Sequence, residues 1–154
     1  MEKESIYSRV EAEIMSVTED EGNVIANMAS VSCLLNIAFE DYFWTGFYMV
    51  DPEKERELVV GPYQGTLGCL RISYDRGVCG KAATTGETQI VKDVNSFPGH
   101  IACDSQTNSE IVVPVHNKEG NLIAVFDVDS TKKSTFDQTD KLWLEKIIKN
   151  VFSK

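Results

Sequence analysis

Hydrophobic residues near the N-terminus recur every three or four positions, which is the period of an α-helix that packs on one face. Two such series follow one another: Ile6, Val10, Ile14 and Val17, then Val24, Met28, Val31, Leu35 and Ala38. Thr18 and Glu21 have the spacing of a capping box, so we expect the second helix to begin just beyond them. The pattern predicts two amphipathic helices within about residues 3–39, packed on the core of the domain. A helix of a second copy is the alternative partner for these faces.

From Tyr42 onward the pattern changes to short runs rich in aromatic and β-branched residues, which favour strands. These runs are Phe43 to Val50, Leu58 to Val60, Leu70 to Ser73, Gln89 to Val91, Glu110 to Val115 and Leu122 to Val128. Short polar segments, 51–56 and 116–121, separate the first two runs and the last two. Both segments suit hairpins, so we expect antiparallel pairing in a sheet within about residues 42–130.

Helical spacing returns near the C-terminus in Leu142, Trp143, Ile147, Ile148 and Val151, and residues 134–140 offer capping side chains. A closing helix is therefore expected over about 137–152. The middle of the chain, 61–104, is rich in glycine and has little regular signal, and no repeat or linker interrupts the rest. The sequence predicts a single α+β domain over 1–154, an antiparallel sheet flanked by N-terminal and C-terminal helices.

Composition narrows the class of protein. The chain has 154 residues, of which 42% are hydrophobic and 25% charged, and its net charge is -9. A surplus of negative charge repels phosphate backbones and anionic lipids, so we expect neither nucleic acid nor a membrane as a partner. The apolar runs are far shorter than the ~18 residues that cross a bilayer. The charged N-terminal segment, Met1 to Val10, does not resemble a secretory signal, and we expect a cytoplasmic protein.

Four cysteines remain to be explained in a chain that is large enough to fold without disulfides. Cys33 lies among apolar residues of the second helix, which predicts a packing role. Cys69, Cys79 and Cys103 fall on loops or at the ends of elements. Zinc sites pair ligands two to four residues apart, and of these cysteines and the two histidines only His100 and Cys103 have that spacing. We therefore expect no metal centre.

Redox chemistry fits the three loop thiols better than zinc does. A thiol that is oxidised to a sulfenic acid needs a second thiol nearby, which resolves it as a disulfide. Gly77 and Gly80 surround Cys79 and indicate a tight turn that opens a helix. Amide dipoles at a helix N-terminus favour a thiolate, so the sequence predicts local activation of Cys79.

Three acidic residues form a second candidate cluster. Glu110 opens one predicted strand, and Asp127 and Asp129 alternate near the end of the next, which places both aspartates on the same face. An ordinary solvent-facing pattern is one interpretation. The very apolar run Leu122 to Phe126 instead indicates a central strand, whose terminal carboxylates would line a cleft. Clustered carboxylates raise one another's pKa, so one of them can stay protonated and act as an acid.

Six motifs of the chain together resemble those of the free methionine-(R)-sulfoxide reductases, single-domain enzymes with a GAF fold, which is related to the PAS fold. The motifs are Trp44-Thr45-Gly46-Phe47-Tyr48, Gly61-Pro62-Tyr63-Gln64-Gly65, Arg76-Gly77-Val78-Cys79-Gly80, Gly99-His100-Ile101-Ala102-Cys103-Asp104, Asn108-Ser109-Glu110-Ile111 and Asp127-Val128-Asp129-Ser130. The resemblance spans about residues 40–140 and includes all three loop cysteines, whereas Cys33 is outside it.

The resemblance implies that the chain reduces free L-methionine (R)-sulfoxide to methionine, with no bound cofactor and with thioredoxin as the external reductant. It implies that Cys103 attacks the sulfoxide sulfur and is left as a sulfenic acid, which Cys69 resolves into a disulfide. Cys79 matches the third cysteine of the family, for which a nucleophilic role and a second resolving role have both been considered. We rank it below Cys103.

The resemblance also assigns tasks to other residues. Glu110, Asp127 and Asp129 match the carboxylates that hold the sulfoxide and the polar ends of the substrate, and the division of labour among them is open. Trp44 and Tyr48 match aromatic contacts that could hold the S-methyl group, and packing in the core is an equal alternative for both.

Two other functions remain as alternatives. A GAF sensory module would use its pocket for a small ligand, although such modules usually come attached to a further domain. A thiol redox sensor without a substrate would use the cysteines alone and would leave the carboxylate cluster unexplained. Relatives in the reductase family are often dimers, so a second copy of the chain is a candidate partner.

Overall fold

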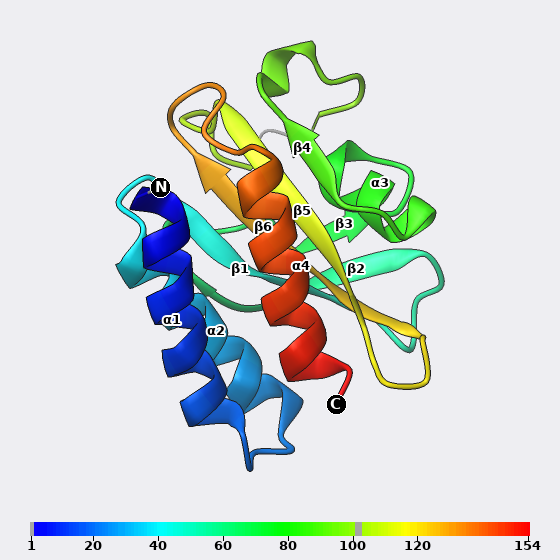
Figure 1. The fold of residues 1–154 in the computed structure, drawn as a ribbon. Coiled ribbons are helices and arrows are strands. Elements are labelled where there is room, and N and C mark those ends of the chain that lie inside the picture. Colours follow the sequence, from blue (N-terminus) through cyan, green and yellow to red (C-terminus); the bar gives the residue numbers. More distant parts are fainter. Residues whose placement is uncertain (1, 101–102) are drawn as a thin grey trace.

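The computed structural model describes residues 2–100 and 103–154 and contains four α-helices and a six-stranded sheet (Figure 1). The helices are α1 (Glu2–Thr18), α2 (Val24–Ala38), α3 (Gly77–Thr85) and α4 (Gln138–Phe152). The strands are β1 (Trp44–Val50), β2 (Glu57–Gln64), β3 (Arg71–Ser73), β4 (Gln89–Val91), β5 (Ser109–His116) and β6 (Leu122–Ser130). A short 3₁₀ turn, Val94–Ser96, follows β4.

The sheet has the strand order β3-β2-β1-β6-β5-β4, and its neighbours are antiparallel. The two hairpins predicted from the polar segments are confirmed as β1–β2 and β5–β6. The most apolar run forms β6, which lies in the middle of the sheet between β1 and β5, as its composition predicted. The α+β fold expected from the sequence is therefore confirmed.

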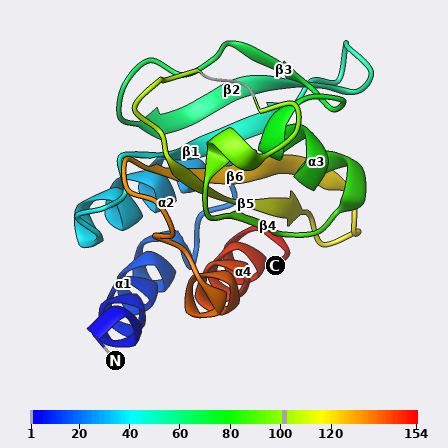
Figure 2. The ribbon, with the colours of Figure 1, turned by 90° about the horizontal axis from the view of Figure 1, so that it is seen from above.

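The two faces of the sheet carry different layers (Figure 2). Helices α1, α2 and α4 cover one face, while α3 and the segments around it cover the other. Alternate residues of each strand point to opposite faces. In β6, Phe126 and Val128 join the core under the three long helices, and Val125 joins the smaller cluster with α3.

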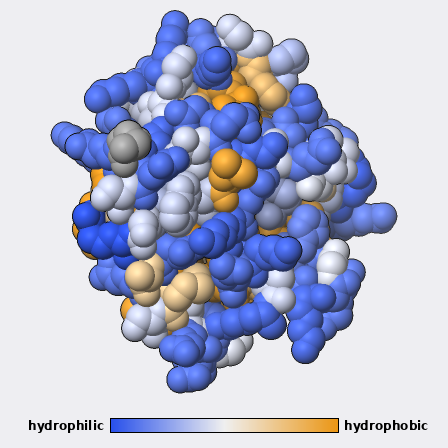
Figure 3. Space-filling view, in the orientation of Figure 1, coloured by the Kyte–Doolittle hydropathy of each residue, from blue (hydrophilic) through white to orange (hydrophobic). Residues whose placement is uncertain are grey.

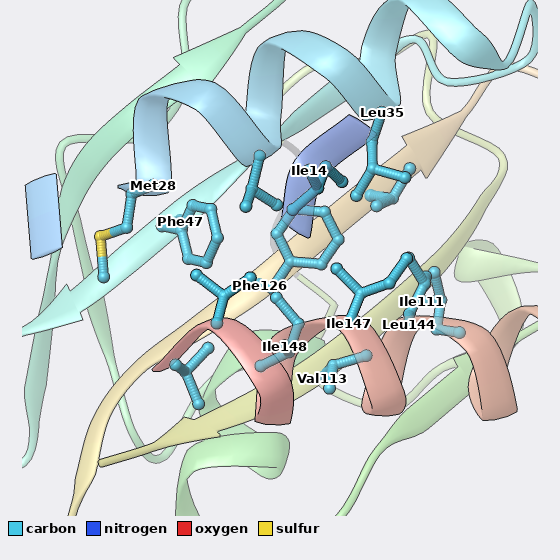
Figure 4. Packing of buried hydrophobic residues seen from close by; sticks show 14 of the residues in the cluster. Ile14, Met28, Leu35, Phe47, Ile111, Val113, Phe126, Leu144, Ile147 and Ile148 are labelled. Carbon is cyan, nitrogen blue, oxygen red and sulfur yellow. The ribbon is translucent and has the colours of Figure 1, made fainter. Parts of the chain in front are cut away.

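The main hydrophobic core lies between the sheet and the three long helices (Figure 4). Phe47 of β1 and Phe126 of β6 are fully buried, with ring centroids 4.9 Å apart. Ile14, Leu35 and Ile147 bring one apolar side chain from each helix against these rings. The helical periodicity of the sequence thus marks the faces that meet the sheet.

The ends of the helices differ in part from expectation. The expected capping box of Thr18 and Glu21 is wrong, because Thr18 is the last residue of α1 and its hydroxyl donates to the Ile14 carbonyl at 2.9 Å. Asn23 caps α2 instead, and its side chain accepts from the amide of Ala26 at 2.9 Å. The cap of α4 lies within the expected segment, at Asp137.

A buried polar group ties the two ends of the fold together. The carboxylate of Asp140 accepts hydrogen bonds from Tyr7 and from Lys3, each at 2.6 Å, and the Tyr7 hydroxyl pairs with that of Tyr42 at 2.5 Å. Asp140 also completes the capping box at the start of α4 by accepting from the amide of Asp137. One carboxylate therefore fixes α1, the start of the sheet and α4 relative to one another.

The surface on the side of α1 and α4 is mostly hydrophilic, with a few separate hydrophobic patches (Figure 3). Among the described residues, no helix is long and apolar enough to cross a membrane. The middle of the chain contains β3 and β4, which confirm the strands expected there, and α3, which begins at Gly77 as the glycines around Cys79 indicated.

Replacing Phe126 with alanine should lower the free energy of unfolding by about 3–5 kcal/mol, because it leaves a cavity under the helices in the centre of the core. Urea denaturation followed by circular dichroism measures the change. Leu142→Ala is the control, because the Leu142 side chain is 68% exposed and its loss should change stability by less than about 0.5 kcal/mol. Equal effects in the two variants would contradict the assignment of the core.

Candidate active site

A small cavity lies on the face of the sheet that carries α3. It measures about 30 Å³, which is room for one or two water molecules. The walls come from the sheet, from the start of α3 and from the segment that ends at Thr107. They include most of the residues that the sequence singled out: Tyr48, Cys79, Cys103, Glu110, Asp127 and Asp129.

Strand register brings the three carboxylates together. Glu110 of β5 lies opposite Asp129 of β6, and Asp127 lies two residues earlier on the same face. On the other side of β6, Asp127 pairs with Gly46 of β1, which has no side chain. Glycine is required there, since a Cβ at position 46 would come within 2.2 Å of the Tyr63 Cβ. The carboxylate cluster that the alternation of Asp127 and Asp129 predicted is therefore present in the structure.

The cluster has little within the protein to neutralise it. Oδ1 of Asp127 and Oδ1 of Asp129 are buried, and neither has a hydrogen-bond partner among the described residues. Burial raises the pKa of the Asp127 carboxyl well above its ordinary value, and the charge of Asp129 raises it further. Burial likewise raises the pKa of Asp129, with Glu110 as the largest charged contributor. Asp127 and Asp129 therefore take up a proton, or gain from binding a cation, more readily than exposed aspartates do.

Cys79 lies against this cluster and is not activated as the sequence predicted. Its thiol is buried at the start of α3, and burial raises its pKa well above the ordinary value. The charges of Glu110 and Asp129 raise that pKa further, and only the interaction with Asp127 acts in the opposite direction. Desolvation and two negative charges outweigh the helix terminus here and favour the neutral thiol at Cys79.

The other two loop cysteines form a disulfide. Cys69 and Cys103 are joined with their Cα atoms 5.3 Å apart, although 34 positions separate them in the sequence. A hydrogen bond next to the pair holds their two segments together, since the Thr66 hydroxyl donates to the Asp104 carboxylate at 2.7 Å. The neighbour of Cys69, Gly68, lies directly on the aromatic side chains of β1.

The two aromatic candidates occupy different places. Tyr48 reaches the wall of the cavity, where burial and then the charge of Asp127 raise the pKa of its hydroxyl. Trp44 packs behind it, with its ring stacked on those of Tyr48 at 5.4 Å and Tyr63 at 4.9 Å. Its indole donates to the carbonyl of Thr66 at 2.9 Å. Trp44 thus supports the Cys69 segment, and its contact with a substrate stays a prediction.

Sequence reasoning gave no role in the site to His100 or Thr107, which both line the cavity. His100 was weighed as a zinc ligand and as a surface or hydrogen-bonding residue, and its Nε2 lies 3.8 Å from Oε1 of Glu110. Thr107 lines the cavity and is buried. The sequence did contain one indication of a role for His100, since it precedes Cys103 by three residues within the motif that begins at Gly99. Cys33 is half-buried in α2, on the far side of the sheet, and is less enclosed than expected.

Three buried residues of the cavity wall could together hold a cation. One ligand atom each of Cys79, Glu110 and Asp127 lies within 4.8 Å of the other two. This set differs from the histidine and cysteine combinations that the sequence suggested for zinc. A divalent ion would find one thiol and two carboxylates here, and a substrate ammonium would find the same carboxylates.

The chain is similar to known proteins in both sequence and structure. Residues 35–151 match the family model of the GAF domain. The chain is 48% identical to GAF domain-containing protein A of Dictyostelium discoideum, over 96% of this chain and 90% of that protein. It is 40% identical to the free methionine-R-sulfoxide reductase of Saccharomyces cerevisiae, over 97% and 85%. The crystal structure of the free methionine-R-sulfoxide reductase of Neisseria meningitidis in complex with its substrate superposes with a TM-score of 0.91 at 45% identity, covering 97% of this chain and 87% of that one.

Asp127→Asn should stabilise the protein increasingly as the pH rises. Because the folded state raises the pKa of Asp127, the neutral carboxyl contributes stability that is full below about pH 4 and is lost as the pH rises through the raised pKa. The amide cannot ionise and avoids that loss. We expect the variant to exceed the wild type by at least about 1 kcal/mol at pH 8, the equivalent of roughly one pKa unit. Urea denaturation at a series of pH values measures the difference.

Asp20→Asn is the matched control, because Asp20 is exposed in the turn after α1. Its stability relative to the wild type should not change with pH. A constant difference between Asp127→Asn and the wild type from pH 4 to pH 8 would show that Asp127 is not held in its neutral form.

Proposed function

The chain belongs to the GAF-domain free methionine-R-sulfoxide reductases, and we propose that it reduces free L-methionine (R)-sulfoxide by a cysteine mechanism recycled by thioredoxin. The observation that carries the proposal is the Cys69–Cys103 pair, joined at the mouth of a cavity that contains a buried carboxylate cluster. A thiol pair supplies two electrons, and the carboxyls supply the proton that a sulfoxide needs.

Cys103 is the nucleophile in this proposal. Its thiolate attacks the sulfoxide sulfur, the sulfoxide oxygen passes to the Cys103 sulfur, and methionine leaves. The leaving oxygen needs a proton as the thiolate attacks. Asp127 and Asp129 are candidates for that acid because burial raises the pKa of both, and Glu110 completes the cluster beside them.

Cys69 is the resolving residue. Its thiol attacks the sulfenic acid on Cys103, a disulfide forms, and the oxygen leaves as water. With the disulfide in place the cavity of about 30 Å³ has no room for an amino acid. The geometry therefore favours an order in which methionine leaves before the disulfide closes.

The environment of Cys79 supports Cys103 as the nucleophile. A nucleophilic cysteine reacts as its thiolate, and burial holds the Cys79 thiol in its neutral form. Cys103 lies in an exposed position outside the carboxylate cluster. Cys79 is instead a wall of the pocket and a neutral neighbour of Asp127.

Selectivity for a free amino acid follows from charge. A substrate with a free ammonium would satisfy the buried oxygens of Asp127 and Asp129, which lack hydrogen-bond partners among the described residues. A methionine inside a peptide has no ammonium to offer and would leave these oxygens unpaired. We propose that the carboxylates select free methionine sulfoxide in this way.

Thioredoxin closes the cycle by reducing the Cys69–Cys103 disulfide. Its dithiol is oxidised to a disulfide as the two cysteines of this chain regain their thiols. Each cycle thus converts methionine sulfoxide and reduced thioredoxin into methionine, water and oxidised thioredoxin, with no bound cofactor.

Substitution of single cysteines tests the assigned roles. Cys103→Ser should abolish methionine release, even in a single turnover with prereduced protein. Cys69→Ser should release about one methionine per chain and then stop, because thioredoxin has no disulfide to reduce. Methionine is quantified by chromatography, and recycling is followed as NADPH consumption with thioredoxin and thioredoxin reductase.

Cys33→Ser is the control and should keep full activity, since Cys33 lies in α2 on the other face of the sheet. Loss of the single turnover in Cys79→Ser, with Cys103→Ser still active, would overturn the choice of nucleophile. No turnover of the sulfoxide by the reduced wild type would overturn the enzyme proposal and favour a sensor module.

The carboxylates should affect the chemical step. Glu110→Gln or Asp129→Asn should slow single-turnover methionine release by about 10²-fold or more if the replaced group is the acid. Rapid-quench measurement at saturating sulfoxide separates this effect from weaker binding, which changes the concentration dependence instead. Wild-type rates in both variants would show that neither residue takes part in proton transfer.

A further inference from the structure

Two of the most exposed leucines in the structure flank a cysteine of the disulfide. Leu67 and Leu70 are 78% and 69% exposed, and Cys69 lies between them. The other large hydrophobic residues with high exposure all belong to helices: Val17, Val24, Ile25, Ile37 and Leu142. Among the described residues, only this segment therefore exposes large apolar side chains outside a helix.

The chain segments on either side of the disulfide contain few charged residues. No charged residue occurs from Leu58 to Leu70, or from Ser105 to Ser109 on the Cys103 side. Over the whole chain, a quarter of the residues are charged and the net charge is -9. The carboxylate of Asp104, which falls between these segments, accepts a hydrogen bond from Thr66. Cys69 thus lies in an uncharged, apolar stretch of a strongly acidic protein, and Asp104 and Arg71 are the charged residues that adjoin the two cysteine segments.

This segment is held in place by its backbone. A Cβ at Gly68 would come within 2.9 Å of Trp44 Cζ2 and 3.0 Å of the Tyr48 hydroxyl, so the chain lies directly on these aromatic rings. The Trp44 indole holds the Thr66 carbonyl, and the amide of Val60 donates to the Leu70 carbonyl at 2.9 Å. The backbone is anchored on both sides of Cys69, while the leucine side chains remain in solvent.

We propose that Leu67 and Leu70 form the docking surface for the dithiol protein that reduces the Cys69–Cys103 disulfide. This inference rests on the proposed function and adds the surface that the reductant recognises. The partner is a protein with a thioredoxin-type dithiol set in an uncharged, apolar surface. Exposed apolar side chains around a reactive centre mark a contact for a protein, whereas a small thiol needs no such surface.

The exchange itself balances without any other reactant. A thiolate of the partner forms a bond to one sulfur of the Cys69–Cys103 pair as the bond between the two breaks, and the released cysteine takes up a proton. The second thiol of the partner then attacks the partner's own sulfur in the mixed disulfide, which releases the other cysteine of this chain as a thiol. The partner ends as a disulfide and this chain as two thiols, a transfer of two electrons.

The double variant Leu67→Ser, Leu70→Ser tests the docking surface. With thioredoxin, thioredoxin reductase and NADPH, its kcat/KM for thioredoxin should fall at least about tenfold, mainly through KM, because the two apolar contacts are lost. Single-turnover methionine release and turnover driven by dithiothreitol should stay at the wild-type level, since neither leucine lines the cavity. The split between thioredoxin and dithiothreitol separates this inference from the proposed function, which would fail in both assays.

Matched controls are available on the helices. Leu142→Ser and Ile37→Ser remove side chains of 68% and 75% exposure and should leave the KM for thioredoxin unchanged. The pair Leu67→Met, Leu70→Met keeps an apolar surface and should restore a KM close to that of the wild type. An unchanged KM for thioredoxin in the double serine variant, or an equal loss with dithiothreitol, would overturn the docking surface.

Discussion

The pairing of β6 with both β1 and β5 is the constraint on which the fold and the site depend. Because β6 is enclosed by strands on both edges and by layers on both faces, it must be apolar, and its alternation then divides the molecule into two parts. Phe126 and Val128 hold the helices, while Asp127 and Asp129 turn to the other face. A shift of one residue in this register would put the carboxylates into the core. The backbone hydrogen bonds that join β6 to β1 and β5 therefore fix both the packing of the core and the position of the carboxylates.

The carboxylates in turn influence which of the cysteine thiols can ionise. Cys79, which sits against them, is kept neutral by burial and by negative charge. Cys69 and Cys103 lie in segments beyond the cluster, where the Thr66–Asp104 hydrogen bond brings them within bonding distance. The proposed mechanism thus separates an acidic pocket, which supplies a proton, from a thiol pair, which exchanges electrons. Buried oxygens that lack hydrogen-bond partners among the described residues lower the stability of the fold, and such a cost is typical of functional sites.

Periodicity was sufficient to predict the long elements, because amphipathic helices and hairpin strands bury one face each and leave a local pattern. It failed where several groups compete. The helix terminus at Cys79 predicted a thiolate, and the carboxylates that reverse the prediction come from β5 and β6, more than thirty residues away in the sequence. His100 was missed for the same reason, since its partner Glu110 becomes a neighbour only in the fold. The pairing of Cys69 with Cys103 was predicted only from the family resemblance, because no local pattern in the sequence indicates that the two residues lie close together.

The edges of the sheet have a consequence for self-association. Both outer strands, β3 and β4, are only three residues long, whereas the interior strands have seven to nine residues. A long, open edge would offer unpaired amides and carbonyls as a template for another chain, which is a route to aggregation. The short edges remove most of that template. Association of two copies by joining their sheets, and fibril growth by addition of strands, are therefore disfavoured.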